Sequence, residues 1–304
     1  MKPRGCELVI NSIDDLLTSL RERLYVAERG LATSIYLAHK LGRPLFLEGE
    51  AGVGKTEVAK VMADIFKTEL VRLQCYEGLD VHHAVYEWNY TRQMMNIRLM
   101  EARGEHISEA ELFSREFLLP RPLLQAIEKS QKSQVVLLVD EIDRSDEEFE
   151  AFLLEILSDY QITIPEIGTI KTQRPPFVVI TSNRTREVHD ALKRRCLYFW
   201  IDYPSLEREY EIVLAKVPDA PEKLARQITA FIQELRQVDL YKIPGVAETL
   251  DWTSVMVMLD QKALNLDVVE ETLGVILKYQ DDIEKITHEH IKPIMERVKV
   301  QVGA

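Results

Sequence analysis

The stretch Gly49-Glu50-Ala51-Gly52-Val53-Gly54-Lys55-Thr56 decides the fold class of this chain. It has the spacing G-x-x-x-x-G-K-T of a phosphate-binding P-loop, in which glycines let bare backbone amides turn sharply and surround the phosphates of a nucleotide. Lys55 is then placed to reach the β- and γ-phosphates, and the Thr56 hydroxyl to bind Mg²⁺. We therefore take the whole stretch, together with the next residue, Glu57, as the candidate nucleotide-binding residues.

The residues on both sides of this loop support that interpretation. Pro44–Leu47 is a short apolar run of the kind that forms buried strands, and residues 57–67 carry apolar side chains at helical spacing. A strand, a glycine loop and a helix in this order are the context that a P-loop requires. The alternative, a flexible glycine turn without a ligand, leaves this context unexplained.

Short apolar runs predict the rest of the first domain. Five of them lie in the first two-thirds of the chain: Pro44–Leu47, Glu69–Leu73, Val135–Val139, Phe177–Thr181 and Leu197–Ile201. The third and fourth runs are continuous rather than alternating, which is typical of strands buried on both faces of a parallel sheet. Helical patterns lie between the runs, so we expect a three-layer α/β domain with a five-stranded parallel sheet over residues 1–203.

The spacing of the remaining segments predicts an insert, a hairpin and a second domain. The connection between the second and third runs is too long for one crossover, so we expect an insert over about residues 76–119. Residues 161–176 alternate between apolar and polar side chains and turn near Gly168, which predicts a hairpin. Beyond residue 203 the spacing is helical with almost no strand signal, which predicts an all-helical domain over residues 204–304.

Composition and charge exclude several classes of protein. The formal net charge of -12 repels a polyphosphate backbone and disfavours general nucleic-acid binding. The three cysteines, Cys6, Cys75 and Cys196, are widely spaced and suit neither a disulfide framework nor a zinc site, which favours a reducing cytoplasm. The first residues lack the apolar core of a signal peptide, and no uncharged apolar run is long enough to span a bilayer.

Polar residues follow two of the predicted strands, where they would meet a nucleotide bound to the P-loop. Asp140 and Glu141 come directly after the run Val135–Val139. A carboxylate at that place holds Mg²⁺ directly or through water, and its neighbour polarises the attacking water as a general base, so we assign Asp140 to the metal and Glu141 to the water. Asn183 follows the next strand and is a candidate to contact the γ-phosphate and orient that water. An acidic turn and a Ser-Asn turn without chemistry are the alternatives.

A basic cluster, Lys193-Arg194-Arg195-Cys196, precedes the last predicted strand. Such a cluster is usually a solvated face. The other interpretation is an arginine finger, a guanidinium supplied in trans to the phosphoryl-transfer site of a neighbouring subunit. In that case the protein must assemble head to tail into a closed ring.

The chain resembles AAA+ ATPases in the order of its motifs. These are the run GEAGVGKT, the VDEID, the TSN and the KRRC, followed by a helical tail. The finer pattern resembles the MoxR branch, in the Arg121–Leu124 segment and in the residues that follow Asp140. The resemblance implies ATP and Mg²⁺ as ligands and a ring, usually a hexamer, as the assembly. It also implies that Arg195 is the trans-acting finger with Arg194 as the second candidate. Tyr25 and Val26 would contact adenine, and residues 204–304 would form a lid.

Three sequence segments resemble those of the subgroup associated with carbon monoxide dehydrogenase: residues 70–80, residues 85–90 and LKRRC at residues 192–196. This resemblance implies a role in maturing molybdenum hydroxylases and a partner with a von Willebrand factor A domain. The chain departs from the family at the sensor-2 arginine of the lid, where Trp252 stands near the expected position. The lid's contribution to catalysis is therefore the open part of the assignment.

We expect an ATP-hydrolysing remodelling or chaperone ATPase that acts on a client metalloenzyme, without nucleic acid and without a membrane span. One alternative is a DNA-associated AAA+ motor, against which the acidic charge counts. Another is a nucleotide-gated binding module that barely hydrolyses, against which Asp140, Glu141 and Asn183 count. A small-molecule kinase is the weakest alternative, because it needs neither Arg195 nor so large a helical tail.

Overall fold

The computed structural model describes residues 10–106 and 108–302. Two compact units make up the chain. Among the described residues, the first holds residues 10–16, Arg29–Glu48 and Thr56–Trp200, and the second holds Leu17–Glu28, Gly49–Lys55 and residues 201–302. The predicted division at residue 203 into two domains stays a prediction.

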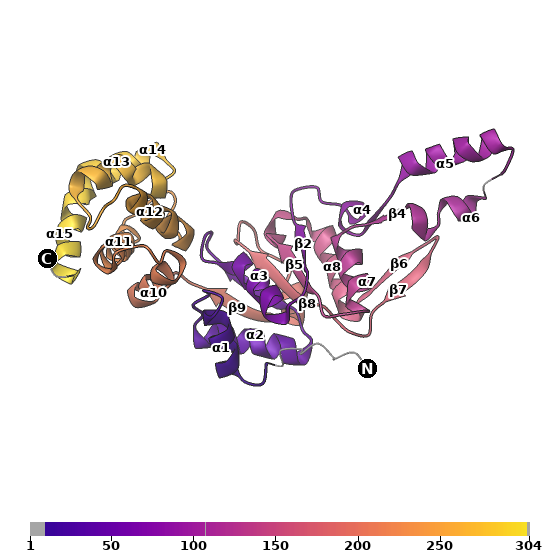
Figure 1. Ribbon diagram of the computed structural model, residues 1–304, viewed down its shortest axis with the longest axis horizontal. Coiled ribbons are helices and arrows are strands. Elements are labelled where there is room, and N and C mark those ends of the chain that lie inside the picture. Colours follow the sequence, from indigo (N-terminus) through magenta and orange to yellow (C-terminus); the bar gives the residue numbers. More distant parts are fainter. Residues whose placement is uncertain (1–9, 107, 303–304) are drawn as a thin grey trace. The chain divides into compact units, whose positions relative to one another are not determined.

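Figure 1 shows the elements in chain order, from indigo to yellow. The helices and strands are α1 (Ile13–Arg21), α2 (Arg29–Leu41), β1 (Leu45–Gly49), α3 (Lys55–Phe66), β2 (Leu70–Gln74), α4 (Val81–Ala84), β3 (Tyr86–Trp88), α5 (Tyr90–Arg103), α6 (Glu109–Leu112), η1 (Arg115–Phe117), β4 (Leu118–Pro120), α7 (Pro122–Ser130), β5 (Val136–Asp140), η2 (Ile142–Arg144), α8 (Glu147–Asp159), β6 (Gln161–Ile164), β7 (Gly168–Lys171), β8 (Phe177–Ser182), α9 (Asp190–Arg195), β9 (Leu197–Ile201), α10 (Leu206–Lys216), α11 (Glu222–Leu235), α12 (Val246–Met258), α13 (Leu266–Ile276), α14 (Gln280–Lys285), η3 (Ile286–His290) and α15 (Ile291–Val302).

The predicted sheet is confirmed, with strand order β2-β5-β8-β1-β9. β5 lies between β2 and β8, and β8 also pairs with β1, all in parallel. Several strands extend one or two residues past the predicted apolar runs, because the ladder continues through polar residues at the carboxyl ends. Gln74 of β2 thus lies in register with Asp140 of β5. Polar side chains of neighbouring strands are therefore gathered at one edge of the sheet, where parallel strands end.

Alternate residues of the central strands face two layers of helices (Figure 1), as continuous apolar strands require. On one face, residues of α7, α8 and α9 form one core with Val178 and Ile180 of β8. On the other face, Phe177 packs edge-to-face against Phe66 of α3 and near His39 of α2. The central strands β5 and β8 are thus enclosed on both faces, and their polar residues lie at their carboxyl ends.

The predicted insert, residues 76–119, contains α4, β3, α5, α6, η1 and the start of β4. β3 and β4 pair in antiparallel fashion and carry the two helices away from the sheet, as Figure 1 shows. Asn89 caps α5, and Ser108 forms a capping box with Glu111 at the start of α6. The predicted hairpin is also present, as the antiparallel pair β6 and β7.

The residues from Leu206 onwards form helices packed around their own core, as the spacing predicts. Phe231 of α11 and Trp252 of α12 are fully buried there, with their rings 5.2 Å apart. The indole N–H of Trp252 donates to the hydroxyl of Thr272, 2.9 Å away. Across the described part of the chain, no helix is both long enough and apolar enough to cross a membrane.

Candidate functional site

The P-loop, Gly49–Thr56, adopts a backbone that only glycine tolerates at its turning points. Gly52 and Gly54 have φ angles of 78° and 94°, a region that other residues rarely enter. At Gly49 a side-chain carbon would lie 2.2 Å from the carbonyl oxygen of Ile201. The buried Lys55 ammonium donates to the carbonyls of Gly49 and Glu50, at 2.7 and 2.5 Å. The glycine pattern of the sequence thus has a direct structural cause in this loop.

The first turn of α12 packs against this loop. The backbone N–H of Ala247 donates to the carbonyl of Gly52, 3.2 Å away. Gly245 allows the approach, because a side-chain carbon there would lie 2.8 Å from the carbonyl oxygen of Ala51. Trp252, two turns further along α12, has no exposed surface and serves the helical core instead. The α12 residues nearest the loop are therefore those of its first turn, at Gly245, rather than the tryptophan.

Tyr25 and Val26, expected near adenine, also lie beside the loop. The Tyr25 hydroxyl is 3.5 Å from the carbonyl oxygen of Gly54. The carbonyl of Val26 accepts a hydrogen bond from Arg208 Nε at 3.3 Å. Glu57, in the first turn of α3, forms an ion pair with Lys60 at 3.2 Å. The structure places these side chains, and their contact with a nucleotide remains a prediction.

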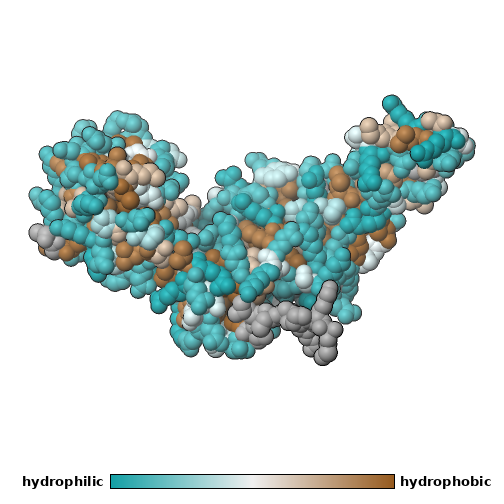
Figure 2. All heavy atoms as spheres, viewed as in Figure 1, coloured by the Kyte–Doolittle hydropathy of each residue, from teal (hydrophilic) through white to brown (hydrophobic). Residues whose placement is uncertain are grey.

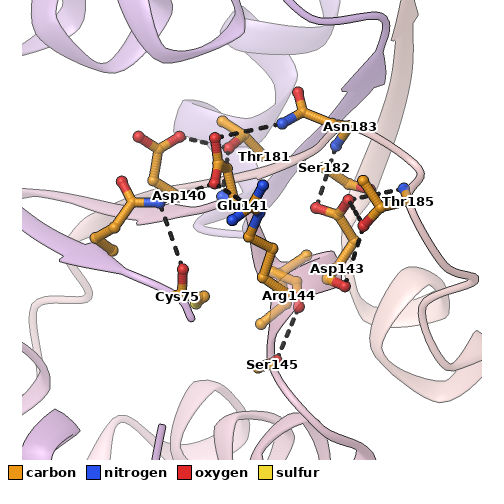
Figure 3. Close-up of polar contacts among 12 residues, drawn as sticks. Cys75, Asp140, Glu141, Asp143, Arg144, Ser145, Thr181, Ser182, Asn183 and Thr185 are labelled. Carbon is orange, nitrogen blue, oxygen red and sulfur yellow. Dashed lines mark hydrogen bonds and ion pairs between the residues drawn. The ribbon is translucent and has the colours of Figure 1, made fainter. Parts of the chain in front are cut away.

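Asp140 is the buried centre of an acidic cluster at the carboxyl end of β5, drawn in part in Figure 3. Its Oδ1 accepts hydrogen bonds from the hydroxyls of Thr56 and Thr181, at 2.9 and 2.6 Å. Its Oδ2 accepts two from the Arg72 guanidinium, at 3.1 and 2.6 Å. Asp140 is therefore held by donors from three elements at once, α3, β8 and β2.

Glu141, the candidate base, is held in an uncommon backbone conformation. Its φ and ψ angles are 57° and 52°, the left-handed region, which costs a residue with a side chain about 1–2 kcal/mol. Its N–H donates to the Thr181 hydroxyl at 2.9 Å. Its carboxylate accepts from Gln74 at 3.1 Å and from Asn183 at 3.4 Å, and it pairs with Arg144 at 3.3 Å. Such fixed strain is characteristic of functional sites.

Asp143 fixes the loop that carries Asn183. Its carboxylate accepts from the backbone amides of Asn183 and Thr185, at 3.1 and 2.9 Å, and from the Thr185 hydroxyl at 2.7 Å (Figure 3). Burial by itself raises the pKa of the Asp143 carboxyl, but these donated bonds outweigh it and hold the pKa below its usual range. Asn183 is thereby kept beside Glu141, and its contact with the γ-phosphate stays a prediction.

The oxygen ligands of this cluster fit Mg²⁺, which prefers carboxylate and hydroxyl oxygens and keeps several waters. Thr56 and Asp140 would hold it, with Asp140 acting through water because both of its oxygens already accept hydrogen bonds. No group of three or more His, Cys, Asp or Glu side chains suited to a metal occurs among residues 10–106 and 108–302. A P-loop site needs none, since the phosphates supply the remaining ligands.

Arg194 and Arg195 are exposed at the end of α9. Arg195 donates to the carbonyl of Leu154 at 3.4 Å, and Arg194 lies 4.0 Å from Asp190. Within the described part of the chain, no hydrogen bond or ion pair joins either arginine to Asp140, Glu141 or Asn183. The structure therefore brings Thr56, Asp140, Glu141 and Asn183 together in one subunit and leaves the two arginines outside that cluster.

Arg72, Gln74 and Thr181 contact the catalytic candidates, and the sequence did not single them out. Arg72 and Gln74 are two residues apart on β2, so they share one face of the strand. The sequence shows that Arg72 and Gln74 share one face of a strand, but it does not show which strand lies next to β2. Only the pairing of β2 with β5 places both side chains against Asp140 and Glu141.

Comparison with known proteins found one family match and several sequence relatives. The model of the AAA domain (dynein-related subfamily) matches residues 44–196. An uncharacterised protein of Staphylococcus aureus is 24% identical over 203 residues, covering 64% of this chain and 69% of that protein. One of Staphylococcus epidermidis is 23% identical over 204 residues, covering 65% of this chain and 70% of its own length.

Among solved structures, the chain is similar to the RuvB Holliday junction branch migration motor of Thermotoga maritima. The match covers 98% of this chain and 86% of the RuvB chain, at 16% identity and a TM-score of 0.46.

The family model spans half of the 304-residue chain, from the strand before the P-loop to the end of α9. The chain belongs to the AAA domain family, in its dynein-related subfamily.

Proposed function

We propose that this protein hydrolyses ATP to ADP and phosphate and uses the energy to remodel a client protein. The observation that carries the proposal is the fixed position of Glu141. Its backbone is held in the left-handed region, and Gln74, Asn183 and Arg144 all contact its carboxylate. A carboxylate held in this way beside a Walker-type Asp140 is suited to accept a proton from a water molecule.

In this mechanism the amides of the P-loop and the Lys55 ammonium bind the β- and γ-phosphates. Thr56 and Asp140 would hold Mg²⁺, which neutralises phosphate charge when bound. Glu141 takes a proton from a water whose oxygen bonds to the γ-phosphorus, while the bond from that phosphorus to the ADP oxygen breaks. Asn183 orients the same water, since its amide already lies beside the Glu141 carboxylate.

The site is completed by a neighbouring subunit in a closed ring, most simply a hexamer. Arg194 and Arg195 are exposed and make no contact with the acidic cluster of their own subunit among the described residues. A guanidinium that is exposed at the surface suits donation to a γ-phosphate in trans, and Arg195 is our first choice for that role. Head-to-tail contacts of this kind close into rings.

The client proposed is a molybdenum hydroxylase such as carbon monoxide dehydrogenase, with a von Willebrand factor A domain protein as partner in the cytoplasm. Both rest on the resemblance to the MoxR branch. The arm β3–α5–α6–β4 supports a role in contacting a client: Met94, Met95 and Leu99 of α5 are each more than half exposed. Figure 2 shows hydrophobic side chains on this arm amid hydrophilic ones. Packing within the arm therefore does not account for these side chains.

Substitution of Glu141 by Gln tests the hydrolysis. The amide keeps the shape but cannot take the proton, so we expect ATP to bind with unchanged Kd and to be hydrolysed at least about 100-fold more slowly. Glu148→Gln is the matched control, because Glu148 is an exposed residue of α8. Unchanged turnover in Glu141→Gln would remove this residue from the mechanism.

The same variant tests the client. Glu141→Gln held with ATP should retain purified apo carbon monoxide dehydrogenase on a column. Adding Met94→Ser and Met95→Ser should abolish retention without changing ATP binding. If Glu141→Gln with ATP retains no more of this client than the ADP-bound wild type, the client assignment is wrong, while the ATPase assignment is unaffected.

A further inference from the structure

Helix α9, which carries Arg194 and Arg195, is tied to strand β1 at two points. The first lies at the helix end. The Arg43 guanidinium donates to the carbonyls of Arg194, Arg195 and Cys196, at 2.8, 3.1 and 3.4 Å. The last carbonyls of a helix have no partner within it, and a cation there both satisfies them and complements the helix dipole. Arg43 lies two residues before β1, so it joins the arginine segment to the start of that strand.

The second point lies at the other end of β1. Glu48, one residue before the P-loop, is 4% exposed. Its carboxylate accepts from the Lys193 ammonium at 3.1 and 3.3 Å and from the Tyr198 hydroxyl at 2.8 Å. Lys193 lies over the rings of Phe46 and Tyr198, at 5.5 and 5.8 Å. The lysine of the basic cluster thus points into the fold, whereas the two arginines after it are exposed.

Tyr198 is the second donor to the Glu48 carboxylate. Burial and the hydrogen bond to Glu48 together raise the pKa of the Tyr198 hydroxyl to about 12. The hydroxyl therefore stays a donor over the physiological range, and Glu48 keeps two donors. Since a buried carboxylate is costly without partners, this pairing fixes the side chain of Lys193, and with it the last turn of α9.

We propose that Arg43 and Lys193 are positioning residues that set the place of Arg195 for the active site of the neighbouring subunit. They form a clamp, defined as Arg43 and the Lys193–Glu48 pair. This inference rests on the proposed trans-acting role of Arg195. The clamp joins the finger to the strand that leads into the P-loop of its own subunit. It thereby links the nucleotide site of one subunit to the site that its finger completes.

Loss of the clamp has a defined kinetic consequence. Misplacing a reacting group by about 1 Å costs about 100-fold in rate, whereas removing a finger costs 10³–10⁵-fold. We therefore expect Arg43→Met and Lys193→Met to lower kcat by about 10- to 100-fold, less than Arg195→Ala, with KM for ATP within about threefold of the wild type. Lys129→Met is the matched control, because Lys129 forms an exposed ion pair with Glu69 elsewhere in the same unit.

Mixing of subunits separates a defective finger from a defective nucleotide site. Lys55→Ala keeps its finger but loses its own nucleotide site, and Arg195→Ala does the reverse. Lys193→Met should regain activity when mixed with Lys55→Ala, which supplies a well-placed finger to its intact site. Lys193→Met should gain no activity when it is mixed with Arg195→Ala, because neither chain then supplies a well-placed arginine finger. Arg43→Met should behave in the same way, and it leaves no buried charge that would endanger folding.

Each result decides a separate question. Three results would overturn the clamp. The first is that Arg195→Ala restores the ATPase activity of the clamp variants, and the second is that neither Arg195→Ala nor Lys55→Ala restores it. The third is a kcat of the clamp variants within twofold of the wild type. Mixing Lys55→Ala with Arg195→Ala is the reference. If that pair regains no activity, the trans-acting finger itself is wrong, and the failure belongs to the proposed function rather than to the clamp.

Discussion

Replacing Thr181 by Val removes one hydroxyl that contacts both the Asp140 carboxylate and the Glu141 backbone. Thr181 is 1% exposed, and valine has nearly the same shape, so the change deletes hydrogen bonds without opening a cavity. The hydroxyl donates to Asp140 at 2.6 Å and accepts from the N–H of Glu141 at 2.9 Å. The substitution therefore tests whether this one group holds the strained backbone of Glu141.

The size of the effect follows from the two bonds. A hydrogen bond to a charged group contributes about 1.5–3 kcal/mol, and an unsatisfied buried amide costs about 1–3 kcal/mol. Asp140 keeps its bonds from Thr56 and Arg72, which limits the loss. We expect a decrease of about 2–4 kcal/mol in the free energy of unfolding of the α/β unit. Glu141 also loses the bond that offsets its backbone strain, so we expect kcat to fall about 10- to 100-fold.

Urea unfolding and steady-state ATP hydrolysis are the two measurements, with ATP binding measured separately. Thr253→Val is the control: its hydroxyl is also buried but donates only to the carbonyl of Thr249, one turn back in α12. That variant should lose less than about 1 kcal/mol and keep its kcat. A Thr181→Val protein whose stability lies within about 0.5 kcal/mol of the wild type and whose kcat is within twofold would refute the reasoning.

Three further predictions concern thiols, acid and glycine. Burial raises the pKa of both the Cys75 and Cys196 thiols to about 12, so iodoacetamide at pH 8 should modify them only after unfolding, as peptide mass mapping will show. The pKa of Asp143 is lower in the folded protein than in the unfolded chain, so the ionised Asp143 carboxylate stabilises the fold. This stabilisation is complete above about pH 4 and is lost as the pH falls through the pKa of the folded state. The urea midpoints of the wild type and Asp143→Asn should therefore converge as the pH is lowered. Gly245→Ala should weaken ATP binding about tenfold or more, because the added side-chain carbon pushes the P-loop away. Gly274→Ala has open space around it and should raise the free energy of unfolding by about 0.5–1 kcal/mol. Equal ATP affinity in the two variants would contradict this steric argument.

Most of the fold followed from local patterns. Short apolar runs identified the five strands, and the two continuous runs, Val135–Val139 and Phe177–Thr181, indicated strands that are buried on both faces. The polar residues at the carboxyl ends of β5 and β8 then predicted Asp140, Glu141 and Asn183 as one group. These features depend on neighbours in the chain, and local spacing encodes them.

Other features depend on residues far apart in the chain. Arg72 and Gln74 face Asp140 and Glu141 only because β5 lies next to β2, and strand order is not written in either strand. The close approach of Gly245 to Ala51 depends on how a helix of the second half packs on the loop. Local spacing placed Trp252 near an expected catalytic position, whereas packing buries it in the helical core.

The amino-acid sequence by itself determined that a P-loop follows a buried strand and that polar residues follow two of the other strands, Asp140 and Glu141 after one and Asn183 after the other. Glycine conformations, apolar runs and helical spacing are local properties, so they can be recognised without coordinates. Only the tertiary structure decided that Lys193 turns inward to Glu48 while Arg195 stays exposed, and that Arg43 holds the end of their helix. These contacts join residues about 150 positions apart, and sheet order and packing bring them together.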